Sequence, residues 1–135
     1  MSAWSEDTFG NDAACDWIAV FLEAPGLDIV WDAVNRVQNS DDYLDSDAGC
    51  ECLAACEVLA RLQGHWGLRN AYSEDLDAWI EANPVAVPDE LKQAAGLAMD
   101  RILGPGSELP ELWDEGGRND KWHDAIDDLR MRVGV

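Results

Sequence analysis

Apolar residues recur at helical spacing along most of the chain. Near the N-terminus, one such stripe comprises Ala14, Trp17, Ile18, Phe21 and Leu22. Asn11 is a suitable N-cap before this stripe, and Pro25 with Gly26 ends the helix after it. The apolar run at residues 85–87 is the only candidate strand, but prolines flank it, and no stretch alternates with period two for long. The pattern therefore predicts an all-α protein.

Further stripes of the same period predict helices downstream. Their inward-facing residues are Val30, Trp31, Val34 and Val37; Leu76, Trp79 and Ile80; Leu91, Ala95, Ala98, Met99, Ile102 and Leu103; Leu109, Leu112 and Trp113; and Trp122, Ala125, Ile126, Leu129 and Val133. The residues expected to begin these helices are Asp28, Ser73, Pro88, Ser107 and Asn119. Asn, Pro and Gly residues follow each stripe and separate it from the next.

The stretch from Asp47 to Gly64 predicts the helix around which the others pack. Its charged residues, Asp47, Glu51, Glu57 and Arg61, fall on one stripe when placed at 100° per residue. The remainder is mainly Ala, Cys, Val and Leu, the reverse of the proportions expected of a surface helix. We therefore expect a central helix, rich in Ala and Cys, that is covered on most sides.

These elements fit one compact domain over residues 1–135, with six to seven helices around the central one. The N-terminal segment 1–10 lacks a helical period but carries Trp4 and Phe9, so we expect it to pack onto the body. Trp4 and Trp66 fall outside the predicted helices. Such aromatic residues either fill the core or anchor a partner, and we expect them to fill the core.

The chain is strongly acidic, with a formal net charge of -19. Residues 1–57 hold 13 of the 28 acidic residues but a single basic one, Arg36. Because phosphate groups would be repelled, this charge argues against direct binding to nucleic acid or to an anionic membrane. It favours a basic protein partner. The alternative, that the acidity serves only solubility or reflects a salt-adapted proteome, stays open.

The four cysteines are interpreted as small core residues of a reduced protein. Cys50, Cys52 and Cys56 lie in the central helix, and Cys15 lies in the first helix. A thiolate metal site is the alternative, but neither CxxC spacing nor a paired histidine motif is present. Signal-peptide and membrane-spanning patterns are also missing from the sequence, so we expect a cytoplasmic protein.

The linker before the central helix concentrates acidic residues. The candidate partner-binding residues are Asp41, Asp42, Tyr43, Asp45 and Asp47. A calcium loop is disfavoured because Gly49 is misplaced for such a loop and Cys56 stands where the closing bidentate Glu is required. The other interpretation of the linker is a solvated turn that caps the central helix.

No catalytic, cofactor-binding or metal-binding residues can be assigned from the sequence. His65 and His123 are the only histidines, and neither has a companion ligand at a metal spacing. GxSxG, GxGxxG and P-loop patterns do not occur. Carboxylates are so numerous that naming one as a general acid or base would be arbitrary. We therefore expect no cofactor, and the sequence favours a function without catalysis.

Three segments resemble a bacterial family known as domain of unknown function 4259. Residues 3–17, AWSEDTFGNDAACDW, are similar to the N-terminal Trp, Phe and Asn-Asp signature of the family; residues 43–64 resemble its Ala-rich middle helix; and residues 106–133 resemble its Ser-Glu-Leu, Leu-Trp and later Trp pattern. Ser5 departs from an expected glycine, and cysteines replace alanines in the middle helix. The resemblance implies no activity and no catalytic residue.

The hypothesis that these features favour is an acidic protein-binding domain of the immunity or inhibitor type. Such a domain would neutralise a basic protein, such as a toxin, through electrostatic steering followed by a few desolvated aromatic contacts. Two alternatives remain: a structural or regulatory homo-oligomeric domain without catalysis, and a hydrolase-like enzyme that uses carboxylates.

Overall fold

The computed structural model describes residue 3 and residues 5–135, and these residues form seven α-helices and no strand. The helices are α1 (Asp12–Glu23), α2 (Leu27–Gln38), α3 (Ser46–Leu62), α4 (Glu74–Ala82), α5 (Asp89–Leu103), α6 (Glu108–Trp113) and α7 (Asp120–Val133). The all-α class with six to seven helices is therefore confirmed. Trp4 lies outside the described residues, so its predicted place in the core is not tested.

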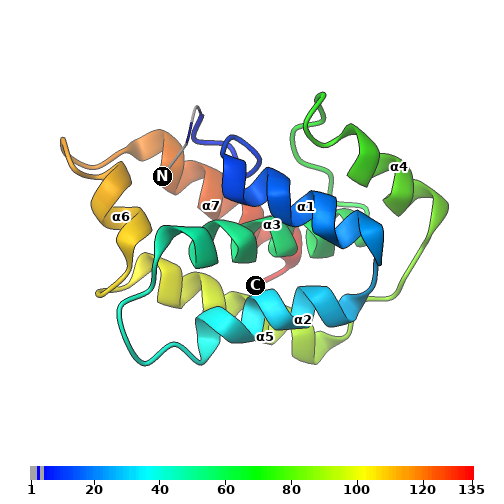
Figure 1. Ribbon diagram of the computed structural model, residues 1–135, viewed down its shortest axis with the longest axis horizontal. Helices are drawn as coiled ribbons and strands as arrows, with labels where there is room; N and C mark the ends of the chain where they lie inside the picture. The colour runs from blue at the N-terminus through cyan, green and yellow to red at the C-terminus, as the bar shows by residue number, and fades with distance from the viewer. Residues whose placement is uncertain (1–2, 4) are drawn as a thin grey trace.

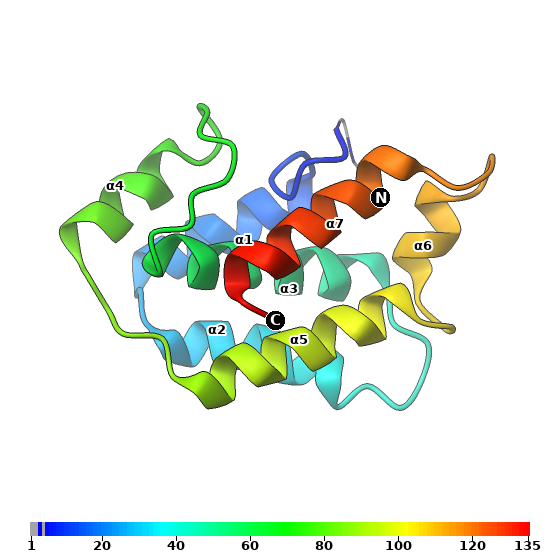
Figure 2. The same cartoon turned by 180° about the vertical axis from the view of Figure 1, so that it is seen from behind.

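Helix α3 is the centre of the packing, as its composition predicts. It contacts each of the other six helices. Figures 1 and 2 show α3 running through the middle of the molecule, with α1 and α7 on opposite sides of it and α2 and α5 together along one edge. Asp47 is the only exposed residue of α3. Glu57 and Arg61 are buried with the apolar residues, so half of the predicted charged stripe does not face solvent.

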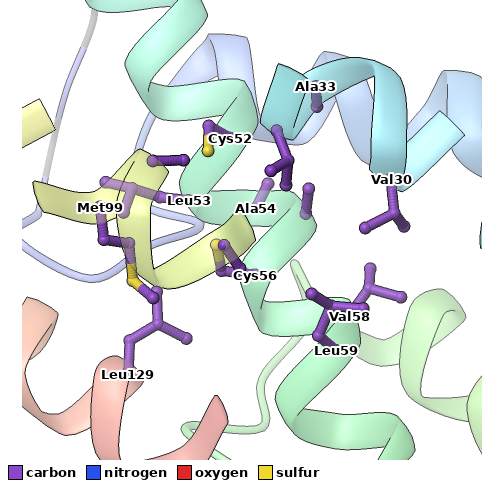
Figure 3. Packing of buried hydrophobic residues seen from close by; sticks show 14 of the residues in the cluster. Val30, Ala33, Cys52, Leu53, Ala54, Cys56, Val58, Leu59, Met99 and Leu129 are labelled. Carbon is purple, nitrogen blue, oxygen red and sulfur yellow. The ribbon is translucent and has the colours of Figure 1, made fainter. Parts of the chain in front are cut away.

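The core is built on the small and apolar residues of α3. Figure 3 shows Val30 of α2, Met99 of α5 and Leu129 of α7 gathered around this helix, and all three are fully buried. Close approach of α6 depends on Gly49, because a Cβ placed there would lie 2.6 Å from Leu109 Cδ1. The absence of side-chain bulk on α3 therefore decides how near its neighbours come.

Two predicted helix caps are present, and Asp45 is a third cap within the acidic turn expected to cap the central helix. Asn11 Oδ1 accepts a hydrogen bond of 2.8 Å from Ala14 N, and Asn119 Oδ1 accepts one of 3.0 Å from Trp122 N. Asp45 Oδ1 accepts one of 2.8 Å from Ala48 N at the start of α3. Each bond satisfies a main-chain N–H group that the helix itself leaves unpaired.

Of three other predicted caps, Asp28 is wrong, and Ser73 and Ser107 are confirmed in position only. Helix α2 begins at Leu27 after Gly26, so Asp28 lies inside the first turn, where its charge meets the positive end of the helix. Ser73 and Ser107 occupy the N-cap positions of α4 and α6 without making a capping hydrogen bond. Ser73 has helical main-chain angles, and its hydroxyl donates to Asp77 instead.

The aromatic stripes are only partly buried. Trp17 and Trp122 are buried, whereas Trp31, Trp79 and Trp113 are half-buried at the edges of the core. The predicted burial of Leu112 is wrong, since its side chain is 37% exposed, because α6 is a short surface helix that buries chiefly Leu109. Phe9 of the N-terminal segment is buried in the core.

Candidate functional site

Four of the five residues predicted to bind a partner lie in the loop between α2 and α3, and the fifth, Asp47, lies in the first turn of α3. We call residues 40–47 together the acidic loop. Its middle residue, Leu44, is buried and anchors it. Leu44 N donates a hydrogen bond of 2.9 Å to Gly106 O, and Leu44 O accepts one of 2.9 Å from Glu108 N. The acidic loop is therefore fixed to the segment between α5 and α6 (Figure 1).

The side chains of Arg101 and Glu108 make additional hydrogen bonds to the main chain of the acidic loop. Arg101 Nη2 donates a hydrogen bond of 2.7 Å to Asp42 O. Glu108 Oε1 accepts one of 2.7 Å from Ser46 N, and this bond lowers the pKa of Glu108. Arg101 also donates to the carbonyl oxygens of Pro105 and Gly106. The hydrogen bonds of Arg101 therefore go to the main chain and not to the aspartate carboxylates of the acidic loop.

All four aspartates of the acidic loop are exposed. Asp45 caps α3, as described above, and lies 3.9 Å from Arg36 Nη2. Tyr43 is 53% exposed, and its hydroxyl donates to Glu111 of α6. That hydrogen bond, together with desolvation and the negative charges of Glu111 and Glu108, raises the pKa of Tyr43 to about 12. The predicted aromatic anchor thus stands beside a further carboxylate.

The structure adds charges that the linker sequence does not reveal. The carboxylates on or beside the acidic loop are Asp41, Asp42, Asp45, Asp47, Glu51, Glu108 and Glu111, and the guanidinium groups beside it are Arg36 and Arg101. Glu108 and Glu111 follow the acidic loop by more than 60 residues. No local pattern could have found them, because the contact between α6 and the acidic loop is made only in the folded chain.

A second polar site, which we call the buried ionic cluster, comprises Glu57, Arg61, Asp77 and Arg132. Glu57 and Arg61 are one turn apart on α3, Asp77 comes from α4 and Arg132 from α7. The side chains of Glu57, Arg61 and Asp77 are at most 4% exposed. The sequence predicts Glu57 and Arg61 on a charged stripe of the central helix, and no local pattern connects them with α4 or α7.

Hydrogen bonds within the cluster use its charged atoms. Arg132 is bidentate on Glu57, with Nη2 at 2.6 Å from Oε1 and Nη1 at 2.9 Å from Oε2. Arg61 Nε donates to Glu57 Oε2 at 3.1 Å, Arg61 Nη1 donates to Asp77, and Arg61 Nη2 donates to Leu68 O at 2.7 Å. Charges buried in this way are compensated in pairs, which is the arrangement that avoids a large desolvation cost.

The cluster is better suited to holding helices together than to catalysis. Burial lowers the pKa of Arg132, but the hydrogen bonds from Arg132 to Glu57 and Asp128 outweigh it, so the pKa is raised above its ordinary value. Ser73 Oγ donates to Asp77 Oδ2 at 2.8 Å and so occupies the second oxygen of that carboxylate. Both oxygens of Glu57 and of Asp77 therefore accept hydrogen bonds from donors of the same chain.

Aromatic rings cover the buried ionic cluster. The guanidinium carbon of Arg61 lies 5.3 Å from the Phe9 ring centre and 5.9 Å from that of Trp66, and Arg69 lies 4.3 Å from Trp66. These distances are within the range of cation–π attraction. Trp66 is half-buried against the core. It therefore packs inward, as expected, and binds two arginines of its own chain.

A cavity of about 450 Å³ opens beside the cluster. Segment 5–10, the loop after α3 and helix α7 form its walls, which lie on the same side of the molecule in Figure 2. Glu57, Arg61 and Arg132 reach it from the buried ionic cluster. Charged side chains at its mouth are Asp7, Lys121, Asp124 and Asp128, and its apolar lining includes Phe9, Leu68 and Ala125.

The cysteines act as core residues, with Cys50, Cys52 and Cys56 buried and none of the four in a disulfide. Burial raises the pKa of Cys50 to about 12, and a hydrogen bond with Cys52 together with burial raises that of Cys56. These thiols stay protonated at neutral pH and are therefore poor nucleophiles. Across the described part of the chain, no group of three or more His, Cys, Asp or Glu residues is placed to hold a metal ion.

The two histidines make separate structural contacts. His65 Nδ1 lies 2.6 Å from Arg132 O, which joins the end of α3 to α7. His123 Nε2 lies 2.9 Å from Asp114 Oδ2, and this contact joins α7 to the residue after α6. Hydrogen bonds from Asn119 N and from His123 lower the pKa of Asp114. Each histidine therefore connects its own pair of elements.

Comparisons with known proteins agree with the resemblance noted in the sequence. The family model described as Domain of unknown function (DUF4259) matches residues 2–125, which is most of the chain. The chain therefore belongs to this family. Neither a curated protein nor a solved structure matches it. Within the residues that the structure describes, no helix is long and apolar enough to cross a membrane.

Proposed function

We propose that this member of the DUF4259 family is a protein-binding domain of the immunity or inhibitor type, which neutralises a basic protein by covering its functional surface. The acidic loop is the contact surface. The observation that carries the proposal is that the acidic loop exposes four aspartates while main-chain hydrogen bonds hold its centre in place. An ordered charged surface loses little conformational entropy when it binds.

The negative charge of the chain steers a basic partner toward it. A net charge of -19 attracts a basic partner over a distance of about one Debye length and speeds association. Tyr43 supplies the short-range contact, since it is 53% exposed and its hydroxyl is already bound to Glu111. A half-exposed ring held in one position fits the role of an aromatic anchor at the centre of an interface.

The experiment is capture of partners from a lysate of the source organism, at low and then moderate salt, on the immobilised protein. The test variant carries Asp41, Asp42, Asp45 and Asp47 replaced by Asn. Asparagine is as good an N-cap as aspartate, so this change keeps the cap of α3 while it removes four charges. A matched control replaces four exposed aspartates elsewhere, Asp16, Asp32, Asp75 and Asp127, by Asn.

We expect the wild type and the matched control to retain one basic protein that the acidic-loop variant does not retain. When this chain is added to the captured protein, the activity of the captured protein should fall. The affinity of the complex should also fall as the salt concentration rises. Equal retention by the acidic-loop variant would refute the proposed surface. Equal loss by both variants would show that only total charge matters, and would refute a specific site.

A further inference from the structure

The cavity beside the buried ionic cluster differs from the acidic loop in place and in chemistry. Its volume of about 450 Å³ is in the range of sites for small ligands. Its apolar lining includes the buried Phe9, the half-buried Ala125 and the exposed Leu68. An apolar body of a few carbon atoms would find contacts there, whereas a fully polar ligand would not.

Carboxylates dominate the mouth. Asp7, Asp124 and Asp128 line the cavity together with one ammonium group, that of Lys121. Among the described residues, neither Asp124 nor Lys121 lies within 4 Å of an opposite charge. Asp128 Oδ2 accepts from Arg132 Nε, which leaves Asp128 Oδ1 available. Free acceptors with negative charge are therefore more numerous at this mouth than free donors.

The guanidinium groups of the cavity wall offer little to an anion. Arg132 gives its N–H groups to Glu57 and Asp128, and Arg61 gives its own to Glu57, Asp77 and a main-chain carbonyl. An anion would have to displace these buried bonds and would also meet the repulsion of a chain with a net charge of -19. A cation displaces none of these bonds and is attracted by the net charge, and the like charge that it meets at the exposed edge of the cavity is that of Lys121.

We infer that this cavity binds an alkylammonium or alkylguanidinium group, with the carbon chain against Phe9 and Ala125 and the cationic head among Asp7, Asp124 and Asp128. Such a group comes either from a free amine or from a lysine or arginine side chain of another protein. The inference does not depend on the acidic loop. Its residues come from segment 5–10, the loop after α3 and α7.

The probes are n-butylammonium and n-butylguanidinium, with 1-butanol as the neutral control and butyrate as the anionic one. Backbone amide shifts in NMR spectra report both the affinity and the place of binding. We expect saturable shifts confined to the cavity residues, and binding of the cations about fivefold tighter than that of 1-butanol, the upper end for an exposed charge pair. Capped Gly-Lys-Gly and Gly-norleucine-Gly peptides test the side chain of a protein as the source.

Three variants test the assigned charges. Asp124→Asn should weaken n-butylammonium binding about threefold, and Lys121→Met should strengthen it by removing a like charge. Asp127→Asn is the matched control, since Asp127 is exposed on the same helix but does not line the cavity, and it should change nothing. The acidic-loop variant should also bind n-butylammonium normally, which separates this test from that of the proposed function.

Each outcome decides the inference. Tight binding of the free cations supports a small-amine site, and binding of the lysine peptide alone supports a site for a protein side chain. Shifts outside the cavity, equal binding of 1-butanol, or equal effects of Asp124→Asn and Asp127→Asn would overturn it.

Discussion

Replacing Glu57 by glutamine tests the buried ionic cluster most directly. The substitution keeps the size of the side chain but removes its charge, and the new amide nitrogen is a donor. Glu57 at present accepts two hydrogen bonds from Arg132 and one from Arg61. In the variant, one donor would face another. Arg61 would keep only Asp77 as an ion-pair partner, and Arg132 would keep only the exposed Asp128.

The expected loss of stability follows from that burial. Removing one partner of a buried ion pair costs about 3–5 kcal/mol, because the remaining charge is left uncompensated. A chain of 135 residues has an unfolding entropy of about 0.28 kcal/mol/K, so Tm should fall by roughly 11 to 18 °C. A domain of this length has a total stability of about 7 to 20 kcal/mol, so the variant should still fold.

The assay is urea unfolding and thermal unfolding at pH 7, followed by tryptophan fluorescence. Glu51→Gln is the control, since Glu51 lies on the same helix and pairs with Arg36 at 2.8 Å. The side chains of this pair are 29% and 55% exposed. An exposed pair of this kind contributes about 0–1 kcal/mol. The control should therefore lower Tm by no more than about 4 °C.

Equal losses in Glu57→Gln and Glu51→Gln would refute the view that the cluster holds α3, α4 and α7 together. The energetic coupling between Glu57 and Arg61 gives a second test of the same view. In a background of Arg61→Gln, the Glu57→Gln change should cost less than it does alone, since part of the interaction has already been removed. Additive losses would mean that the two side chains act independently.

Further predictions concern hydroxyl groups, a phenol and thiols. Ser107→Ala should be neutral or slightly stabilising, because the Ser107 hydroxyl is buried and has no hydrogen-bond partner among the described residues. Ser73→Ala should cost about 1–3 kcal/mol, because the Ser73 hydroxyl donates to a buried carboxylate of α4; urea unfolding compares the two variants. Glu111→Gln should lower the pKa of Tyr43 from about 12 toward 10, as measured by ultraviolet absorbance of the phenol. In the wild type, the phenol donates its hydrogen bond only while it is protonated. The stability that this bond contributes is therefore present below pH 10 and is lost as pH rises through 12. A thiol reagent should modify Cys15 slowly in the native protein and the three cysteines of α3 only after unfolding, and rapid labelling of all four would contradict the burial described here.

Local sequence was sufficient to predict the helices, because their signals lie within a few residues of one another. The stripe at residues 14–22 and the caps at Asn11 and Asn119 depend on main-chain geometry that nearby residues determine. The central place of α3 was also predictable, since a helix made largely of Ala, Cys and Leu has no polar face wide enough for a surface position.

Local sequence was insufficient to predict the hydrogen-bond partners of several polar side chains. Ser73 has the residue type of a cap, but its main chain is helical and its hydroxyl donates to Asp77, four residues later in the same helix. The burial of Asp77 beside Arg61 of α3 is what the local sequence does not reveal. Glu57 and Arg61 fit an exposed polar stripe equally well until α4 and α7 supply Asp77 and Arg132.

The sequence by itself determined the all-helical class, the central helix, the acidity and the exposed aspartates of the acidic loop. These properties depend on composition and on contacts between near neighbours. Only the tertiary structure decided the buried ionic cluster, the cavity beside it and the attachment of Tyr43 to Glu111. Each of these joins side chains that are distant in sequence, and the free energy of burying a charge depends on which partners the folded chain brings to it.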